Sequence, residues 1–238
     1  MKNKTRKITG YTIWKGLSPF TDTPIVAVIT LESSIEKTGN IPQLAIIDSG
    51  DIPPHVLVEF GEDKSVCGTC PHAGGNGCYV QTYRAPYQIW KAYQAGKYPP
   101  LPLAWRTERR IRLGSYGDPT AIPLDVLAAL GARSASGVLG YTHQWRTCSP
   151  DYARFCMASV DTPRERQEAH KLGYRTFRIM PSTVDYKDRL PGEAICAYAS
   201  AGVSCRHCGA CCGSGKGWKG DIVIKAHGVR KNRLRIAA

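Results

Sequence analysis

The chain has 238 residues, 42% of them hydrophobic, which is ordinary for a globular protein with one sizeable core. It carries 32 lysine and arginine residues against 19 aspartate and glutamate residues, and the formal net charge of +13 makes nucleic acid a candidate partner. No apolar run approaches the roughly 18 residues of a membrane span and no apolar core follows the basic start, so we expect no membrane partner, no secretory signal and a cytoplasmic location.

Part of the positive charge lies at the two ends of the sequence. The residues concerned are Lys2, Lys4, Arg6 and Lys7 at the start, and Arg230, Lys231, Arg233 and Arg235 at the end. Solvated tails explain such residues as well as contact with nucleic acid does. Metal-bound cysteines would be thiolates and would cancel a further part of the formal charge.

Residues 1–60 are rich in β-branched and aromatic residues. Strands are predicted at Ile8 to Trp14, Ile25 to Leu31 and Leu44 to Ile47, with a turn at Thr38 to Asn40. We expect an N-terminal β-hairpin or small sheet that serves as scaffold.

A glycine-rich loop with three cysteines follows. Cys67 and Cys70 have the C-x2-C spacing at which two thiolates reach one metal, and seven residues separate Cys70 from Cys78. Without an export signal, clustered cysteines are more often metal ligands or redox groups than disulfides. The three could hold zinc with His72 as fourth ligand, or three irons of a 4Fe–4S cluster with one iron left open. The spacing leaves both alternatives open.

From residue 61 to 190, strands alternate with helices of about ten residues, which predicts βα units and a parallel sheet. Helices are expected at 86–96, 123–130 and 163–172, and strands at 109–113, 136–142, 155–160 and 174–180. Polar segments follow the strands at Gly114 to Asp118, Tyr141 to Trp145 and Ser159 to Asp161. Because ligands collect at the carboxyl ends of parallel strands, we expect these segments to share a pocket, with His143 and Asp161 as candidate acid–base residues. The structural alternative is a histidine satisfied by a backbone carbonyl.

Residues 191–238 form a cysteine-rich tail. Cys196, Cys205, Cys208 and Cys211 give a C-x8-C-x2-C-x2-C set, a full complement of four thiolates for an iron–sulfur cluster or for zinc. Cys212 follows directly, and the sequence does not say whether it or His72 is a ligand. The run from Gly213 to Gly220 lacks the spacing of a phosphate-binding loop, so we interpret it as a connector.

Several motifs together resemble a family of uncharacterised phage and bacterial proteins that is itself similar to radical S-adenosylmethionine proteins. The motifs are C-x2-C-P…C-Y, R-I-R-L-G-S-Y-G-D-P, G-Y-T-H-Q-W, C-M-A-S-V-D, E-A-H-K-L-G-Y-R-T-F-R, C-x2-C-x2-C and V-I-K-A-H-G, and they span Pro24 to Gly228. In the radical family three cysteines bind a 4Fe–4S cluster, and Cys67, Cys70 and Cys78 match them in order. The usual order is C-x3-C-x2-C, whereas here the close pair comes first.

The resemblance implies an α/β fold, a partial (β/α) barrel of radical S-adenosylmethionine type at 61–190 between the N-terminal segment and the tail. It implies contact of the cofactor with the turn that follows the second barrel strand, here Gly114, Ser115, Tyr116, Gly117, Asp118 and Pro119. It also implies a second, auxiliary cluster in the tail. The partners would be an electron donor and an unknown substrate, in the host cytoplasm if the chain is phage-encoded.

Two functions are therefore carried forward. The first is an iron–sulfur protein that, if it is an enzyme, uses S-adenosylmethionine for radical chemistry. The second is a zinc-stabilised basic protein that binds nucleic acid in phage replication or regulation. Polar residues at successive strand ends favour the first, because a simple binding module does not need them.

Overall fold

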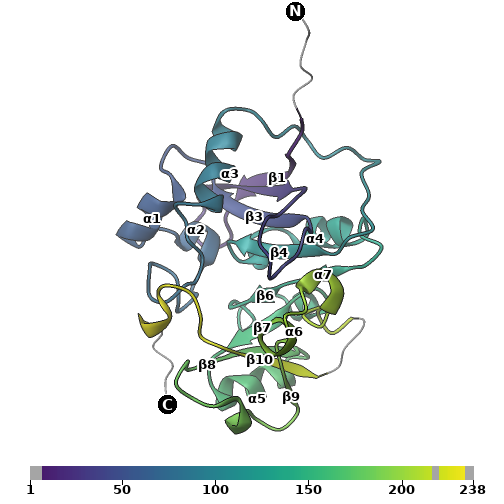
Figure 1. Ribbon diagram of the computed structural model, residues 1–238. Helices are drawn as coiled ribbons and strands as arrows, with labels where there is room; N and C mark the ends of the chain where they lie inside the picture. The colour runs from purple at the N-terminus through teal and green to yellow at the C-terminus, as the bar shows by residue number, and fades with distance from the viewer. Residues whose placement is uncertain (1–6, 216–219, 234–238) are drawn as a thin grey trace, which may run out of the picture.

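The computed structural model describes residues 7–215 and 220–233. The basic residues Lys2, Lys4, Arg6 and Arg235, and positions 216–219 of the expected connector, lie outside this range. The described chain forms two five-stranded sheets, one above the other in Figure 1, with helices around them. The predicted α/β class is confirmed.

The first sheet is mixed and has the strand order β1-β2-β3-β4-β5. Its strands are β1 (Gly10–Leu17), β2 (Pro24–Thr30), β3 (Gln43–Asp48), β4 (Ile111–Tyr116) and β5 (Val138–Leu139). The first three are antiparallel, as the N-terminal segment predicted, and β4 and β5 continue the sheet in parallel with β3. The N-terminal strands therefore belong to a larger sheet, not to one of their own.

The second sheet is parallel throughout and has the order β6-β7-β8-β10-β9. Its strands are β6 (Tyr141–Thr142), β7 (Met157–Val160), β8 (Thr176–Met180), β9 (Glu193–Ile195) and β10 (Asp221–Lys225). The predicted parallel sheet is confirmed. The short β9 was not predicted, because three residues carry no period.

One segment joins the two sheets. The predicted strand at 136–142 is divided at Gly140, so that β5 pairs with β4 and β6 pairs with β7. A Cβ at Gly140 would lie 2.8 Å from the Cβ of Leu113, so only glycine fits this close approach. Parallel pairing thus continues from β3 across both sheets to β9.

The helices are short and lie around the sheets (Figure 1). They are α1 (Pro54–Phe60), α2 (Lys64–Cys67), α3 (Ala85–Gln94), α4 (Leu124–Gly131), α5 (Pro163–Lys171), α6 (Ala197–Ala201) and α7 (Cys205–Cys208). The three predicted helices are α3, α4 and α5. The N-terminus of α5 has a complete capping box between Thr162 and Glu165.

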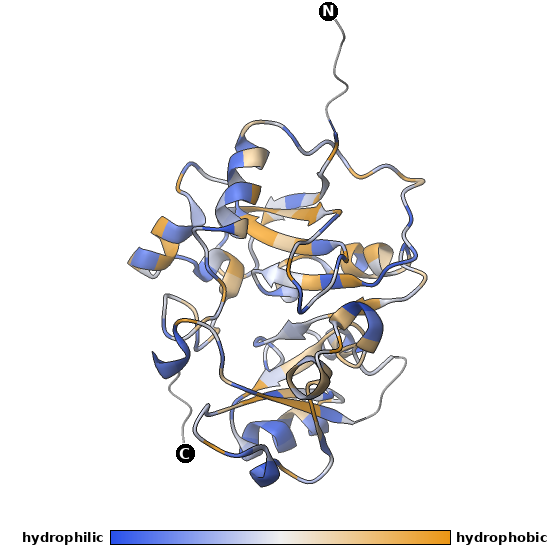
Figure 2. Cartoon of the chain, viewed as in Figure 1, coloured by the Kyte–Doolittle hydropathy of each residue, from blue (hydrophilic) through white to orange (hydrophobic). Residues whose placement is uncertain are grey.

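The apolar strands lie inside and the polar helix faces lie outside (Figure 2). Strands β2 and β3 are almost fully buried and share one core with Leu127 and Leu130 of α4. A second core contains Phe177, Ile222 and two of the tail cysteines, Cys196 and Cys211. The tail is therefore part of the folded core, not an appendage.

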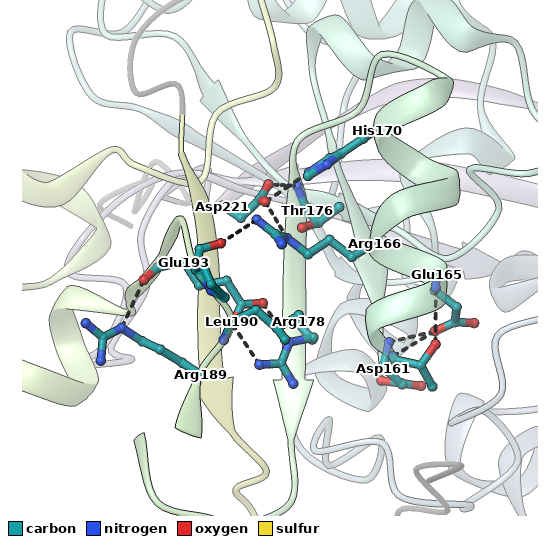
Figure 3. A network of polar contacts seen from close by, with 12 residues as sticks. Asp161, Glu165, Arg166, His170, Thr176, Arg178, Arg189, Leu190, Glu193 and Asp221 are labelled. Carbon is teal, nitrogen blue, oxygen red and sulfur yellow. Dashed lines mark hydrogen bonds and ion pairs between the residues drawn. The ribbon is translucent and has the colours of Figure 1, made fainter. Parts of the chain in front are cut away.

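Buried ion pairs fasten the far edge of the second sheet (Figure 3). Arg178 of β8 binds both carboxylate oxygens of Glu193 in β9, at 2.6 and 2.7 Å. Asp221 of β10 accepts hydrogen bonds from Arg166 of α5 and from the Thr176 amide, at 2.7 and 2.8 Å. These pairs fix β9 and β10, the strands on either side of the cysteine-rich tail. In the described part of the chain, no helix is long and apolar enough to cross a membrane.

Candidate metal sites

The first cysteine loop begins at the end of α2, where Cys67 is the last helical residue. The Cys70 amide donates to the Cys67 carbonyl, and the Cys78 amide donates to the His72 carbonyl, at 3.2 and 3.1 Å. These bonds close residues 67–78 into a compact loop. Asp63, just before α2, accepts from the Gly74 amide at 3.2 Å and so holds the middle of the loop.

The three thiols are shielded from water and lie close enough to repel one another as anions. Burial raises the pKa of Cys67 well above its usual value, and Asp63, Cys70 and Cys78 raise it further. Burial is also the main reason why the pKa of Cys70 is about 12 and that of Cys78 about 11. Without a metal the thiols therefore stay protonated, and a bound cation would displace these protons.

The polar strand ends meet beneath this loop, as the sequence predicted. Asp118, after β4, accepts from the Thr142 hydroxyl and from the His143 amide at the end of β6, at 2.8 and 2.9 Å. Asp118 and Asp161, after β7, are both near enough to raise the pKa of Cys70. The ends of three neighbouring strands thus share one polar region with the thiols.

His72 is already paired. Its Nε2 lies 2.9 Å from a carboxylate oxygen of Asp161, and both side chains are largely buried. The His143 ring meets the His72 ring edge-on, with centroids 5.4 Å apart. Of the two candidate acid–base residues, Asp161 therefore binds the cysteine loop and His143 adjoins it.

Two buried polar atoms beside the thiols have no hydrogen-bond partner among the described residues. They are the Tyr116 hydroxyl and Nε2 of His143. Burial, followed by Cys67 and other nearby anions, raises the pKa of Tyr116 well above its usual range. Burial lowers the pKa of His143, against the opposing effect of Asp118 and Asp161. A buried polar atom without a partner is costly, so these two atoms indicate a place for a polar ligand.

Gln144 fastens the loop to the strand ends, a role that the sequence did not predict. Its Nε2 donates to the Cys67 carbonyl at 3.1 Å, and its Oε1 accepts from the Thr69 hydroxyl at 2.9 Å. A Cβ on Gly68 would lie 2.8 Å from the Gln144 amide, so a glycine is needed there. The position of Gln144 in a strand-end segment was the one available signal.

The turn Gly114–Pro119, the expected cofactor contact, is held by bonds within the protein. Gly114 and Gly117 have positive φ, and a Cβ on either would meet backbone or proline atoms within 2.9 Å. Ser115 donates to the Leu44 carbonyl, and Asp118 binds Thr120 as well as the β6 end. The Tyr116 hydroxyl is the polar side-chain atom of this turn that is left for a ligand.

The tail cysteines form the second group. Cys196, Cys205, Cys208 and Cys211 line one small pocket, together with Lys37 and Tyr141. Cys196 directly follows β9, Cys205 and Cys208 begin and end α7, and Cys211 lies in the second core. The predicted set of four is therefore brought together. Cys212 is turned to Arg175, whose Nη1 lies 3.6 Å from its sulfur.

Cations and a phenol surround the tail thiols. Burial raises the pKa of Cys205, and Arg112 and Lys37 partly oppose that effect. Burial also raises the pKa of Cys211 to about 12, although a hydrogen bond with Tyr141 lowers it. The first group has carboxylates as neighbours, whereas this one has positive charges that stabilise thiolates.

Within residues 7–215 and 220–233, no three or more histidine, cysteine, aspartate or glutamate side chains stand in the arrangement that holds a metal ion. The donor sets still fit different centres: four thiols suit zinc or a closed cluster, and three thiols suit a cluster with an open iron. Comparisons with family models, with curated proteins and with solved structures find no match.

Proposed function

We propose that the protein is an iron–sulfur protein of radical S-adenosylmethionine type, in which Cys67, Cys70 and Cys78 hold a 4Fe–4S cluster. The observation that supports this most is the position of the three half-buried cysteines near the ends of β4, β6 and β7, where parallel sheets bind ligands. Parallel pairing runs from β3 to β5 in the first sheet and from β6 to β9 in the second, and the segment 138–142 joins the two, which is compatible with a partial (β/α) barrel.

The number of thiols supports a cluster over zinc at this loop. A closed zinc site needs a fourth ligand, and His72 is the nearest nitrogen in sequence. Its Nε2 is held by Asp161, so Nδ1 is the ring nitrogen left for a metal. Three thiolates without a fourth ligand suit a cluster whose last iron binds a small molecule.

The surroundings of the loop suit a cationic cofactor. Asp63, Asp118 and Asp161 all raise thiol pKa values there, so the region is negative. S-adenosylmethionine carries a sulfonium and an ammonium group, and the cluster would supply the electron that breaks the sulfonium bond. The Tyr116 hydroxyl and Nε2 of His143 would orient polar groups of the bound molecules, and the strand ends would exclude water.

Anaerobic purification tests the proposal. We expect a brown protein with broad visible absorption, with iron and sulfide in equal amounts, and with a paramagnetic signal after reduction that changes when S-adenosylmethionine is added. Cys148, a thiol outside both groups that lies 3.2 Å from the Tyr174 hydroxyl, provides the control. Cys148→Ser should keep the full spectrum.

A colourless protein with stoichiometric zinc and no iron would contradict the proposal and favour the zinc-stabilised alternative. A brown protein whose paramagnetic signal does not change when S-adenosylmethionine is added would support the cluster and contradict the binding of this cofactor.

A further inference from the structure

A buried arginine lies between the two cysteine groups. Arg112 follows Ile111 on β4 and faces away from the core that Ile111 and Leu113 enter. Its Nη2 donates to the Tyr79 hydroxyl at 2.5 Å, and Tyr79 is the residue after Cys78 of the first loop. Its charge also reaches Cys205 of the tail. Arg112 therefore lies between the first cysteine loop and the tail cysteines.

A second cation stands beside it. Lys37, in the connection between β2 and β3, has its Nζ 3.1 Å from Nε2 of His227. The His227 ring in turn lies against the Tyr79 ring, with centroids 5.1 Å apart. Lys37 and Arg112 thus flank a Tyr79–His227 pair, and the four residues come from four separate segments of the chain.

This cluster has no carboxylate. In the described part of the chain, Arg112 makes one side-chain hydrogen bond out of the five that a guanidinium can donate, and neither cation has an acidic partner. Burial, with Lys37 and Arg112, lowers the pKa of His227 to about 4. Arg112 is buried and Lys37 is half-buried, and buried cations are normally paired with anions, so the cluster lacks a carboxylate as counter-charge.

One tail thiol lies near both cations, since Arg112 and Lys37 lower the pKa of Cys205 against the larger effect of burial. Arg110 borders the α7 loop: its Nη1 donates to the Arg206 carbonyl at 3.0 Å, and its guanidinium lies against Gly209. Among the described residues, the side-chain hydrogen bond of Arg112 is made to Tyr79.

A basic segment lies beside this cluster. After β10 the chain returns to the first cysteine loop. In Figure 1 this C-terminal part is yellow and lies beside the blue loops of the first half of the chain. Gly228 packs against Tyr79, and the Arg230 guanidinium is near Gly75 and lowers the pKa of Cys78, against the larger effect of burial. Positive charge therefore continues from the surface inward.

We propose that Arg112, Lys37, Tyr79 and His227 form an anion-binding subsite, which takes a phosphate or carboxylate group of the substrate and holds that substrate next to the first cysteine loop. The claim that the anion belongs to a substrate rests on the proposed function. The binding of the anion does not, because none of the four residues is a proposed metal ligand.

Calorimetric titration of the anaerobically purified chain with inorganic pyrophosphate, and separately with citrate, tests the subsite against chloride at matched ionic strength. Loss of one charge-assisted hydrogen bond should weaken binding about tenfold, so Arg112→Gln and Lys37→Gln should each raise Kd by about that factor. Arg106, which is exposed and donates to carbonyls of its own loop, gives the matched control. Arg106→Gln should leave Kd within about twofold.

Three results would overturn the subsite. They are no binding above the chloride baseline, equal weakening by Arg106→Gln, or an Arg112→Gln chain that loses tail metal while its pyrophosphate affinity is unchanged. The last would mean that Arg112 serves the tail centre. If the purified chain binds pyrophosphate but contains no iron, the subsite is supported and the proposed iron–sulfur function is contradicted. The two hypotheses can therefore fail separately.

Discussion

The two cysteine groups differ in number, surroundings and place. Cys67, Cys70 and Cys78 lie at strand ends among carboxylates, beside buried polar atoms that have no partner among the described residues. The four tail thiols line a small pocket among cations, and Cys196 and Cys211 belong to an apolar core. On the proposed function, this contrast assigns different roles to the two groups: the tail centre would stabilise the fold, and the loop centre would be open to small molecules.

The largest expected effect is at the tail. Cys211→Ala should lower the free energy of unfolding by more than about 5 kcal/mol, because a metal that bridges segments of a core contributes its binding energy to folding. Urea unfolding followed by circular dichroism measures this. Cys67→Ala is the counterpart at the loop and should cost about 1 kcal/mol.

A chelator separates metal loss from the loss of a buried thiol. It should destabilise the wild type and leave Cys211→Ala nearly unchanged. If Cys67→Ala were more destabilising than Cys211→Ala, the claim that the tail centre is the one that stabilises the fold would be contradicted.

Next in size is the ion pair that holds β9, the strand that leads into Cys196. Glu193→Gln removes the charge opposite the buried Arg178 and should cost about 3–5 kcal/mol. Because β9 positions the tail, the same variant should release tail metal more readily than loop metal. Arg164→Gln, which breaks an exposed pair with Glu168, is the control and should change little. Equal metal loss from the loop and from the tail would count against the claim that the two cysteine groups hold separate centres.

A smaller and pH-dependent effect is expected at Asp221. Burial alone would raise its pKa, but the Thr176 amide, Arg166 and His170 outweigh burial and hold the pKa below its usual value. The charged form is thus favoured in the folded state. The resulting stability is full above the unfolded pKa of about 4 and is lost as the pH falls through the lower folded value.

Asp221→Asn should therefore lower stability by about 2 kcal/mol at neutral pH and show a flatter decline below about pH 4. Urea unfolding at several pH values measures both. Parallel acid profiles for variant and wild type would show that Asp221 is not the responsible group.

The smallest effect concerns how tightly the loop is held. Gln144→Ala removes its bonds to Thr69 and to the Cys67 carbonyl, and should cost about 1–2 kcal/mol. Hydrogen exchange at the Thr69 and Cys78 amides should speed up, while amides of the tail stay protected. The matched control is Gln94→Ala, an exposed glutamine that binds the Gly50 carbonyl. Faster exchange in the tail would mean that the two sites are mechanically coupled.

Local patterns predicted the regular elements well. The alternation of strands and helices predicted α5 and the parallel sheet, because it is a property of neighbouring residues. The sequence also predicted that Asp118, His143 and Asp161 would meet, because parallel strands end at one edge. Short elements such as α2 and β9 were missed, since four or three residues have no period.

Pairings across the chain were beyond the sequence. His72 was an alternative zinc ligand, but its partner Asp161 lies 89 residues away and no local spacing relates the two. The subsite of Arg112, Tyr79, Lys37 and His227 likewise depends on β4 lying next to β3, and on the chain after β10 returning to the first loop. Spacing identified both cysteine sets, and only the fold showed their opposite electrostatic surroundings.

The central claim is that the two cysteine groups are separate centres, and metal counting in paired variants tests it most directly. After anaerobic purification, Cys67→Ala should lose the iron of the loop cluster and keep the tail metal. Cys211→Ala should lose the tail metal and keep the loop cluster in the fraction that folds. Loss of both centres in Cys67→Ala, with the fold intact, would contradict the account, because it would place thiols of the two groups around one metal site.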